Sequence, residues 1–588
     1  MKMAKYNCIE LNIRDGELLG LTKLRSIEKD ALNSKNSVYI YKGTKTQKIY
    51  IGQTIHFRER HKQHYSKDKE VFENADFDSV LVIFSKYFNK SALDDVEIQL
   101  ITYFIADSSN FKKREVEFDR EEVINKKRKN TVNEYIGREK VASEVILPLW
   151  EDVLYPNQWV NTKTIDELRA KELVKYSPIK ILTDEQYALI DEIIQHPQKN
   201  YVINGDAGTG KTILLTHLVA RLIKENEYNR IGVIVQPNWA KTALEIFKVY
   251  GISGRNLTIA TSTKLINTHE NFDIIIVDES HKLSRKYGKQ HPSFNEVYKI
   301  AKFANCSSHL EIIKRLGKQI VLMYDVLQAI RPANITRDMF KDLTEGYEKR
   351  FLATQFRIQT SKEKNYTSDD YVDGVKYLLY KDTGLLESEF TSFNSKFNRD
   401  VFRDKEVDAY FGYFTEQPLH QLIDWIEEDN NFNPEHINRI LAGLVEPWTQ
   451  SDGKDIDKKH WHEGEIHRRW NSTQENWLNS KDLDAEEQIG SVFAVQGLDL
   501  NKVGVLIGND IQVNEFGQLE GNPKGFLNTN GIFTQEEMEI QENKDEFTLL
   551  VLNSYYVLMT RGIDGIRLGF WYNDQFRKYM EKTLDILN

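Results

Sequence analysis

The stretch that most constrains the fold is YVINGDAGTGKTILLTHLVARLI, which begins at Tyr201. It has the pattern of an apolar strand, a glycine-rich loop and a helix with apolar residues at helical spacing. The loop has the full G-x-x-x-x-G-K-T spacing. Its glycines, Gly205, Gly208 and Gly210, let backbone N–H groups turn toward phosphate oxygens, and the positive end of the following helix adds to the attraction. The sequence therefore predicts a phosphate-binding loop between a buried strand and a helix.

Two side chains of this loop and an acidic pair downstream complete a candidate nucleotide site. We expect Lys211 to reach the β and γ phosphates and Thr212 to hold Mg²⁺. In FDIIIVDESHKLS, Asp278 ends a predicted buried strand and is expected to bind Mg²⁺ through its water. Glu279 follows at once, placed to orient or deprotonate an attacking water. An acidic pair at a strand end can also cap a helix, but this pair lies downstream of a phosphate loop, as an ATPase core requires.

Apolar, β-branched runs recur on both sides of the loop and alternate with helical patterns. These runs include RIGVIVQP, NLTIATS, FDIIIVDES and QIVLMYD, and IGSVFAV, KVGVLIG and IRLGFWY repeat the pattern late in the chain. Fully apolar strands separated by helices indicate parallel sheets covered on both faces. The expected fold class is α/β, with a small N-terminal α+β domain followed by two parallel-sheet lobes.

Composition and proline positions predict how the 588 residues are divided. We expect a leader, a first domain, a connector and two lobes, and the leader is predicted to contain a helix from Leu18 to Leu32. The predicted ranges are 1–36 for the leader, 37–137 for the first domain, 138–180 for the connector, 181–348 for the first lobe and 349–588 for the second lobe, with an insertion around 360–483.

Charge and cysteine content narrow the class of protein. The net charge is −10, so nucleic acid would have to meet local basic patches, such as RERHKQH and NKKRK. The two cysteines, Cys8 and Cys306, make neither a disulfide framework nor a zinc site and fit a reducing compartment. No run approaches the roughly 18 apolar residues of a membrane helix, and the start of the chain lacks a signal-peptide core. We expect a cytoplasmic protein that does not bind a membrane.

Further motifs follow one another in the order found in superfamily-one helicases, and the match runs from about Ile181 to Tyr572. ILTDEQYALID resembles the adenine-reading motif, with Gln186 as the reader. VIVQPNWAKTA and TIATSTKL lie where that superfamily contacts the nucleic-acid strand. VLMYDVLQAIRP resembles the third motif, in which Asp325 and Gln328 couple the phosphate state to strand binding. The resemblance implies two RecA-like lobes, ATP and Mg²⁺ as cofactors, and DNA or RNA as partner.

The remaining motifs lie in the predicted second lobe. LATQFRI resembles the fourth motif, VFAVQGLDLNKVGVLIG the fifth, led by Gln496 and Gly497, and NSYYVLMTRGIDGIRL the sixth. The resemblance implies that Arg357 and Arg561 reach the γ-phosphate as arginine fingers, which raise turnover by about 10³–10⁵-fold. For either arginine alone, a surface salt bridge is the alternative. We expect Arg561 to lie between two strand-like runs. VDESHKLS, TQFRI and HRRWN resemble more narrowly a subgroup of bacterial helicase-like ATPases related to Schlafen proteins.

Near the N-terminus, SVYIYKGTKTQKIYIGQT forms a predicted hairpin that carries Tyr39 and Tyr50 in its two runs. It resembles the GIY-YIG nuclease motif, but Ser37 stands where the family has its first glycine. The family next has an arginine on a helix, and FRERHKQH offers Arg60, with His64 four residues later on the same helical face.

The family's metal-binding glutamate matches Glu97. Glu97 lies four residues after Leu93 and four before Ile101, so it falls on an apolar helical stripe. A carboxylate there is costly unless it is paired or binds metal. A pair with Arg60 is the alternative, which would itself bring the two into one site.

The resemblance gives these residues roles in phosphodiester cleavage. Glu97 would hold one Mg²⁺ or Mn²⁺, Arg60 would contact the scissile phosphate, and Tyr50 or Tyr39 would take the proton of the attacking water. His64 is an alternative base. The family's final asparagine matches either Asn125 or Asn130.

These motifs together predict an ATP-dependent nuclease–helicase that acts on nucleic acid. The alternative is a nucleic-acid-stimulated ATPase whose N-terminal domain binds without cutting, because Ser37 departs from the family pattern. A scaffold that uses ATP as a structural ligand is a third interpretation, which the acidic pair and the two arginines disfavour. By the habits of such fusions, we expect a setting in bacterial antiviral defence, with a homo-oligomer or a defence-system protein as partner.

Overall fold

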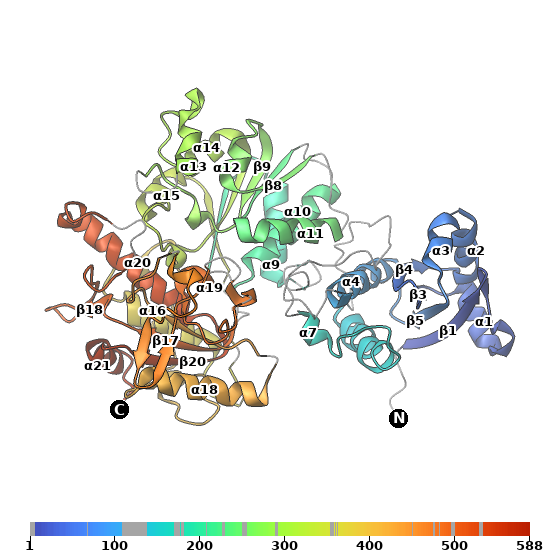
Figure 1. Ribbon diagram of the computed structural model, residues 1–588. Helices are drawn as coiled ribbons and strands as arrows, with labels where there is room; N and C mark the ends of the chain where they lie inside the picture. The colour runs from blue at the N-terminus through green and yellow to red at the C-terminus, as the bar shows by residue number, and fades with distance from the viewer. Residues whose placement is uncertain are drawn as a thin grey trace. The chain divides into compact units, whose positions relative to one another are not determined.

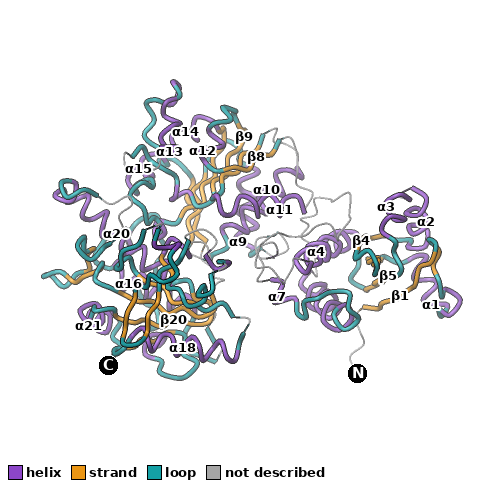
Figure 2. Tube along the Cα trace, in the orientation of Figure 1, coloured by secondary structure: helices purple, strands orange, loops and turns teal. Residues whose placement is uncertain are grey.

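The computed structural model shows two compact units, drawn as a ribbon in Figure 1 and as a Cα trace in Figure 2. One unit comprises Met1–Ile190, Thr212–Tyr228 and Lys241–Leu257, and the other comprises Asp191–Lys211, Asn229–Ala240 and Thr258–Asn588. The structure describes residues 6–587 apart from 68, 109–137, 170–173, 175–176, 178–181, 207, 226–229, 250–255, 288–291, 353–357, 359, 362, 435, 450, 474–476, 481, 496–499 and 528–532.

The N-terminal unit is built on an antiparallel sheet with the strand order β2-β1-β5-β3-β4. Its strands are β1 (Tyr6–Arg14), β2 (Glu17–Leu18), β3 (Ser37–Gly43), β4 (Lys48–Thr54) and β5 (Ser79–Ser85). The central strands β3 and β5 are buried along most of their length, as expected of β-branched and aromatic runs such as VYIY and VLVIF. The predicted hairpin is therefore confirmed as β3 and β4.

Helices cover both faces of this sheet. They are α1 (Ser26–Ser34), α2 (Phe57–Lys67), α3 (Lys69–Ala75) and α4 (Lys90–Ser108). Leu32 of α1, Phe57 of α2 and Phe72 of α3 pack with Tyr39 and Tyr41 in one hydrophobic core. The helix α4 packs against β3 and β4. Two helical layers thus enclose the hairpin, and the alternating residues of β3 and β4 point into different layers.

The segment before the hairpin differs from the prediction. The expected helix from Leu18 to Leu32 begins only at Ser26. Before it, β1 pairs with β5 in antiparallel register. The apolar side chains of Ile9, Leu11 and Ile13 are buried and alternate with polar neighbours, which is the period of a half-buried strand. The leader residues therefore form part of the N-terminal sheet.

Short helices follow the first sheet in the chain. They are α5 (Arg138–Val141), α6 (Leu147–Leu149), α7 (Ile165–Arg169) and α9 (Asp184–Gln195), with π-helical turns at Ala142–Ile146 and Trp150–Leu154. Arg138 is buried and bonds to Asp95 of α4 at 3.2 Å. Trp150 is also buried, and its indole N–H donates to the Thr162 carbonyl at 3.0 Å. The Arg138 pair and the ring contacts of Trp150 with Tyr103 and Phe104 hold this segment against α4.

The second unit contains a parallel sheet with the order β11-β6-β10-β9-β7-β8. Its strands are β6 (Tyr201–Gly205), β7 (Ile231–Ile234), β8 (Leu257–Ala260), β9 (Phe272–Val277), β10 (Gly317–Tyr324) and β11 (Glu348–Leu352). The helices of this unit are α12 (Ser262–Ile266), α13 (Pro292–Asn295), α14 (His309–Leu316) and α15 (Arg337–Leu343), whereas most of α10 (Lys211–Glu225) and of α11 (Pro237–Val249) belongs to the first unit. Because β6, β9 and β10 are parallel neighbours, the residues after each strand meet at one edge of the sheet.

A second parallel sheet has the order β12-β20-β17-β13-β16. Its strands are β12 (Phe411–Phe414), β13 (Arg439–Ala442), β16 (Gly490–Ser491), β17 (Leu500–Ile507) and β20 (Gly562–Phe570). Two hairpins, β14 (Trp461–Glu463) with β15 (Ile466–Arg468) and β18 (Ile511–Val513) with β19 (Leu519–Gly521), stand apart from it. The helices are α16 (Ser368–Tyr380), α17 (Asp400–Arg403), α18 (Pro418–Phe432), α19 (Val492–Val495), α20 (Gln541–Met559) and α21 (Asp574–Thr583).

The predicted α/β class, with a small α+β part and two parallel sheets, is confirmed, although two local predictions are wrong. IGSVFAV forms a strand only at Gly490–Ser491 and continues as the helical turn α19. The run before Arg561 is the helix α20 and not a strand, so Arg561 lies between a helix and β20. No helix among the described residues is both long and apolar enough to span a membrane.

Candidate functional site

In the N-terminal unit, the hairpin register brings the motif residues together. Tyr39 lies directly opposite Gly52, and Tyr41 lies opposite Tyr50. The rings of Tyr39 and Tyr50 are therefore diagonal neighbours on one face, stacked with centroids 6.4 Å apart. A Cβ atom on Gly52 would lie 2.5 Å from Cζ of Tyr39, so this position has no room for a side chain. The glycine of the motif is required because the phenol of Tyr39 lies across it.

Replacing Gly52 by Ala tests this close approach. The added methyl group would displace the Tyr39 ring, and we expect the free energy of unfolding to fall by about 1–3 kcal/mol. Thermal unfolding measures the loss. The matched control is Gly565→Ala, because a Cβ atom there would be 3.4 Å from its nearest neighbour and should be accommodated. Equal stability of Gly52→Ala and the wild-type protein would contradict the packing described here.

The helix α2 delivers Arg60 and His64 to the tyrosines, as their spacing predicted. The Tyr39 hydroxyl and Nε2 of His64 share a hydrogen bond at 2.9 Å. The His64 ring is buried, stacks on Phe72 with centroids 4.3 Å apart, and contacts the Tyr50 ring at 5.0 Å. His64 is therefore part of the aromatic core of the site and not a surface histidine.

Electrostatics distinguish the two tyrosines from each other. Burial raises the pKa of the Tyr39 hydroxyl well above its ordinary value. The neighbouring Tyr50 raises this pKa further, whereas Arg60 lowers it. Burial also opposes the charge of Arg60, but hydrogen bonds to Tyr39 and Tyr50 raise the pKa of Arg60 above its ordinary value. Tyr39 is almost fully buried, whereas Tyr50 and Arg60 are only half-buried. Tyr50 and Arg60 are thus the members of this group that a substrate can touch.

Ser37 is accommodated in the sheet where the family has glycine. The residue is buried, pairs with Thr54 of β4 and Phe84 of β5, and its hydroxyl donates to the Thr54 carbonyl at 3.2 Å. The serine hydroxyl is therefore satisfied, and the register that aligns Tyr39 with Gly52 is kept.

The variant Ser37→Gly tests whether this departure matters. We expect it to lose about 1 kcal/mol of stability, because glycine weakens a strand interior and the hydroxyl bond disappears. We expect no change in the rate of nucleic-acid cleavage, since the tyrosines keep their positions. Cleavage that appeared only in the variant would show instead that Ser37 disables the site.

Glu97 lies on α4 beside the end of β4. Nε2 of Gln53 donates to Oε2 of Glu97 at 3.1 Å and also to Asp94, one helical turn earlier. The charge of Glu97 contributes to the raised pKa of Tyr39, so the two groups are within electrostatic reach. The two carboxylates provide oxygen ligands of the kind that Mg²⁺ or Mn²⁺ prefers, while the Gln53 amide donates to both of them. The described residues contain no group of three or more His, Cys, Asp or Glu side chains suited to a metal.

In the second unit, the phosphate loop has the geometry that its sequence predicted. Gly208 and Gly210 have φ values of 89° and 82°, a region that favours glycine. The Asp206 carbonyl accepts from the Thr209 hydroxyl at 2.9 Å and from Nζ of Lys211 at 3.0 Å. Lys211 also bonds to the Gly205 carbonyl, so its ammonium lies over its own loop.

The acidic pair follows β9 at the same edge of the sheet. Asp278 is buried, and its Oδ1 has no hydrogen-bond partner among the described residues. Burial raises the pKa of Asp278 to about 7, and the neighbouring Glu279 adds to the effect. An orphaned buried carboxylate oxygen fits a site that receives a cation or its water.

Glu279 has the left-handed backbone conformation, with φ 51° and ψ 48°, which is rare for a residue other than glycine. Nε2 of His281 lies 2.9 Å from Oε2 of Glu279, and Nζ of Lys282 lies 3.4 Å from the same oxygen. Burial opposes the charge of Glu279, but Lys282 and His281 hold its pKa well below the ordinary value. Glu279 is therefore ionised beside an Asp278 that gains a proton more readily.

A chain of polar contacts leads from Lys211 to Arg561. Nζ of Lys211 lies 3.6 Å from Asp325, which accepts from Nε2 of Gln328 at 2.7 Å. Oε1 of Gln328 accepts from Nη2 of Arg561 at 3.2 Å. All four side chains are buried, so Arg561 is not a surface salt bridge. Three predicted motifs thus meet in one network that a bound phosphate could perturb.

The other predicted residues of the ATPase are not brought into this network. Gln186 lies on α9. Its side-chain carbonyl accepts from the backbone N–H of Thr183 at 3.1 Å, and its backbone N–H donates to the Thr183 hydroxyl. Thr212 is half-buried in the first turn of α10. The predicted residues that lie outside the described part of the chain are Asn125, Asn130, Arg357, Gln496 and Gly497.

Sequence reasoning missed several side chains that contact the predicted ones. Gln53 directly follows the glycine of its motif, and His281 is two positions after Glu279, so their places beside known motifs were available signals. Asp94 precedes Glu97 by one helical turn. Lys376, which bonds to Asp206 at 2.6 Å, lies far away in sequence and gave no such signal.

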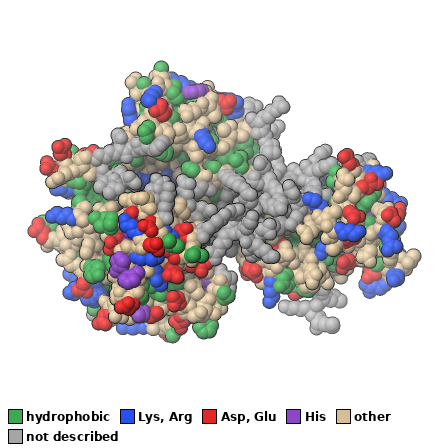
Figure 3. Space-filling model, in the orientation of Figure 1, with side chains coloured by type: hydrophobic (Ala, Val, Ile, Leu, Met, Phe, Trp, Pro, Cys, Tyr) green, Lys and Arg blue, Asp and Glu red, His purple; other side chains and the backbone are tan. Residues whose placement is uncertain are grey.

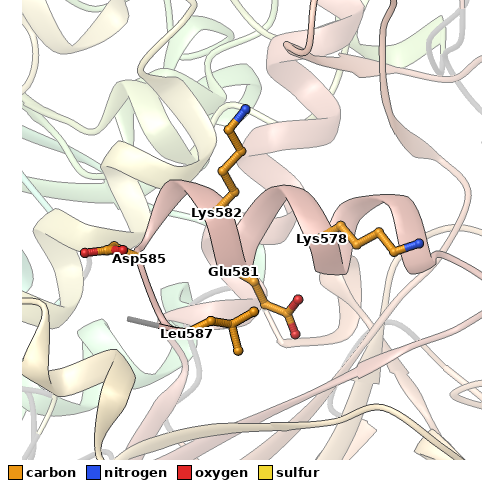
Figure 4. A pocket seen from close by; sticks show the side chains of 5 residues that line it. All are labelled: Lys578, Glu581, Lys582, Asp585 and Leu587. Atoms are coloured by element: carbon orange, nitrogen blue, oxygen red, sulfur yellow. The ribbon is translucent and has the colours of Figure 1, made fainter.

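The hollow at the end of α21 lies apart from the predicted site residues. Lys and Arg side chains are interspersed with Asp and Glu on the face drawn in Figure 3. A hollow of about 330 Å³ at the end of α21 is lined by Lys578, Glu581, Lys582, Asp585 and Leu587. Figure 4 shows the side chains of Lys578 and Lys582 extending in different directions from α21. Lys578 pairs with Asp574 at 2.7 Å, and the hollow contains none of the predicted site residues.

Comparison with known families agrees with both sets of motifs. Residues 198–571 match the family described as Schlafen group 3, DNA/RNA helicase domain. Residues 35–110 match the GIY-YIG catalytic domain. The two resemblances found in the sequence are therefore confirmed.

Individual relatives are distant. An uncharacterized protein of Saccharomyces cerevisiae is 24% identical over 414 residues, which cover 65% of this chain and 84% of the relative. An uncharacterized ATP-binding protein of Methanocaldococcus jannaschii is 22% identical over 251 residues, covering 41% of this chain and 68% of the relative. Among solved structures, the Pif1 helicase from Candida albicans matches with a TM-score of 0.27 and 12% identity, covering 69% of this chain and 100% of that chain.

Proposed function

Because the chain belongs to the Schlafen group 3 helicase family and also carries a GIY-YIG catalytic domain, we propose that it is an ATP-dependent nuclease–helicase acting on nucleic acid. In this proposal, the helicase region hydrolyses ATP to move along or open DNA or RNA. The GIY-YIG domain cuts phosphodiester bonds. An antiviral role, a cytoplasmic location and a partner protein or second copy remain predictions from the sequence.

The observation that carries the ATPase half is the buried network from Lys211 to Arg561. Lys211 would bind the β and γ phosphates, and Glu279 would orient the attacking water. Arg561 would stabilise charge on the γ-phosphate once nucleotide draws it from Gln328. Opening and closing of the nucleotide site is then the step that moves the strand. Gln186 is the proposed reader of the adenine, and Arg357 is proposed to reach the γ-phosphate. Gln496 and Gly497 of the fifth motif are also proposed to bind the nucleotide.

The residues present fit a magnesium ion at the ATPase site. The orphaned Oδ1 of Asp278 and the hydroxyl of Thr212 are the proposed ligands, directly or through water. The ion would neutralise charge on the β and γ phosphates. Burial, reinforced by the charge of Glu279, raises the pKa of Asp278, and a bound cation would favour its ionised form.

The nuclease half rests on the cluster of Tyr39, Tyr50, Arg60 and His64. Arg60 is held by hydrogen bonds to both phenols, with its guanidinium half-buried, and would bind the scissile phosphate. Tyr50 is the more exposed phenol, and its phenolate, assisted by the positive charge of Arg60, is the proposed acceptor of the water's proton. Tyr39 is too deeply buried for that role, so it would act with His64 to position Tyr50 and Arg60.

A metal ion fits the carboxylates on α4. Glu97 would hold Mg²⁺ or Mn²⁺, and Asp94 is a second oxygen donor on the same face of the helix, bridged to it by Gln53. The metal would supply charge neutralisation for the leaving oxygen. Gln53 would keep the Glu97 carboxylate oriented while the ion is absent.

A binding-only N-terminal domain is the second candidate, because Ser37 stands where the family pattern has its first glycine. The test is to measure ATP turnover and strand cleavage in the same reaction, with and without single-stranded DNA or RNA. The nuclease–helicase proposal expects both to occur, whereas turnover with binding but without product would replace it by the second candidate.

A further inference from the structure

The phosphate loop contains a carboxylate that no role above explains. Asp206 follows the first glycine of the loop, and its backbone carbonyl holds both Thr209 and Lys211. A negative side chain at this point opposes the binding of a polyphosphate unless it is neutralised. Because Lys211 is the residue proposed to bind the phosphates, a second cation is needed to neutralise the Asp206 carboxylate.

That cation comes from α16. Nζ of Lys376 lies 2.6 Å from Oδ2 of Asp206 and also donates to the Ser392 carbonyl. The Lys376 side chain is only 1% exposed, whereas that of Asp206 is 23% exposed. Burying an ammonium is costly unless it is paired and hydrogen-bonded. The contacts with Asp206 and with the Ser392 carbonyl offset this cost for Lys376.

Two further carboxylates on α16 add negative charge near Asp206 and Lys376. Asp369 and Asp373 lie on the same helix, and the charge of Asp206 acts on both of them. Burial raises the pKa of Asp373 to about 6, against the opposing effect of Lys376. Burial also raises the pKa of Asp369. Without Lys376, an acidic group would face the loop with no compensating charge from this helix.

The same helix is tied to the segment that holds Arg561. The Tyr380 hydroxyl donates to Asn553 of α20 at 2.7 Å. The Asn553 amide in turn donates to the carbonyls of Val326 and Ala329, which flank Gln328. The Tyr371 hydroxyl donates to the Met559 carbonyl at the end of α20, two residues before Arg561. One helix therefore holds the phosphate loop and both sides of the Gln328–Arg561 contact.

We propose that Lys376 is a positioning residue for the bound nucleotide, which neutralises Asp206 and fixes the phosphate loop to α16. This inference rests on the proposed ATPase function and extends it to a residue outside the helicase motifs. Nucleotide bound at the loop would then act directly on α16, because Lys376 joins this helix to the loop. The same helix contacts the segment before Arg561 through Tyr371 and Tyr380.

The test uses the full chain and measures the Kd for ATP with Mg²⁺ by calorimetry, together with kcat and KM for ATP turnover. Lys376→Met removes the charge but keeps the length of the side chain, and we expect Kd and KM to rise by about tenfold. The value of kcat should change less than Kd and KM. In the double variant Asp206→Asn with Lys376→Met, the orphaned charge is gone, and Kd should return to within about threefold of the wild-type value.

The control is Lys381→Met at the end of the same helix, whose lysine pairs with Asp382 and not with the loop. Its Kd and KM should not change. A merely structural role for Lys376 predicts instead a lower melting temperature, parallel losses in kcat and affinity, and no rescue by Asp206→Asn. Either that pattern or an unchanged Kd in Lys376→Met overturns the proposal.

The outcome also separates this inference from the proposed function. Wild-type protein that binds ATP without turnover would refute the ATPase proposal, while the affinities of the variants would still decide the role of Lys376. Wild-type protein that does not bind ATP would refute both.

Discussion

Replacing Lys211 by Ala is expected to lower ATP turnover by at least about 100-fold. Lys211 is buried, lies over the carbonyls of its own loop, and faces Asp325 at 3.6 Å, so its ammonium is already placed where phosphate would arrive. Its loss removes a point charge that this loop cannot replace. Steady-state release of phosphate in the presence of single-stranded nucleic acid is the measurement.

The matched control for Lys211 is Lys318→Ala. Lys318 lies on β10 of the same sheet, but its side chain is exposed and pairs with Asp273 at 2.7 Å. We expect its turnover to equal that of the wild-type protein. If Lys211→Ala hydrolysed ATP at the wild-type rate, the phosphate loop would not be the ATPase site.

Removing the Glu97 carboxylate is expected to abolish strand cleavage while ATP turnover survives. Both Glu97→Ala and the nearly isosteric Glu97→Gln should lower cleavage by roughly 100-fold or more, because a metal ligand supplies several kcal/mol of charge stabilisation. Tyr50→Phe should have the same effect if its hydroxyl accepts the proton. Cleavage of labelled nucleic acid with Mg²⁺ or Mn²⁺, read on a denaturing gel, measures the loss.

Glu73→Gln provides the control for Glu97. Glu73 is exposed on α3 and pairs only loosely with Lys69, at 3.5 Å, so the variant should cut normally. Unchanged cleavage in both Glu97→Ala and Tyr50→Phe would refute the assignment of the nuclease site. Loss of ATP turnover in these variants would instead indicate that the two activities are coupled.

The parallel sheets could be predicted because their strands are buried on both faces. In the run FDIIIV the four residues from Ile274 to Val277 are all apolar and buried, and the loop after YVING has the full spacing of a phosphate-binding loop. The ends of adjacent parallel strands must then meet. The convergence of Lys211, Asp278 and Asp325 follows from topology alone.

The helix α20 could not be distinguished from a strand by the same reasoning. From Leu550 to Met559 every residue is buried, so the sequence shows no polar stripe at helical spacing. An apolar run with aromatic and β-branched residues has the same local pattern in a buried helix and in a buried strand. The packing of α20 on all sides depends on the tertiary structure, so the local sequence pattern could not show that this run is a helix.

The neighbours of the site residues could not be predicted from the sequence where they lie far away along the chain. Lys376 and Asp206 are separated by 170 positions, and no spacing rule links them. The role of Gln53 depends on the end of β4 lying beside α4, and that of β1 on its pairing with β5. The sequence predicted the residue types of each site through its motifs, and the fold determined their neighbours.

The most direct test of the central claim is to incubate the full chain with plasmid, linear duplex, single-stranded DNA and RNA, with and without ATP and Mg²⁺. Cleavage products and released phosphate are measured in the same samples. The account predicts metal-dependent cleavage of at least one of these substrates and ATP turnover that nucleic acid stimulates. Absence of cleavage with every substrate in the presence of metal, or turnover indifferent to nucleic acid, would contradict it.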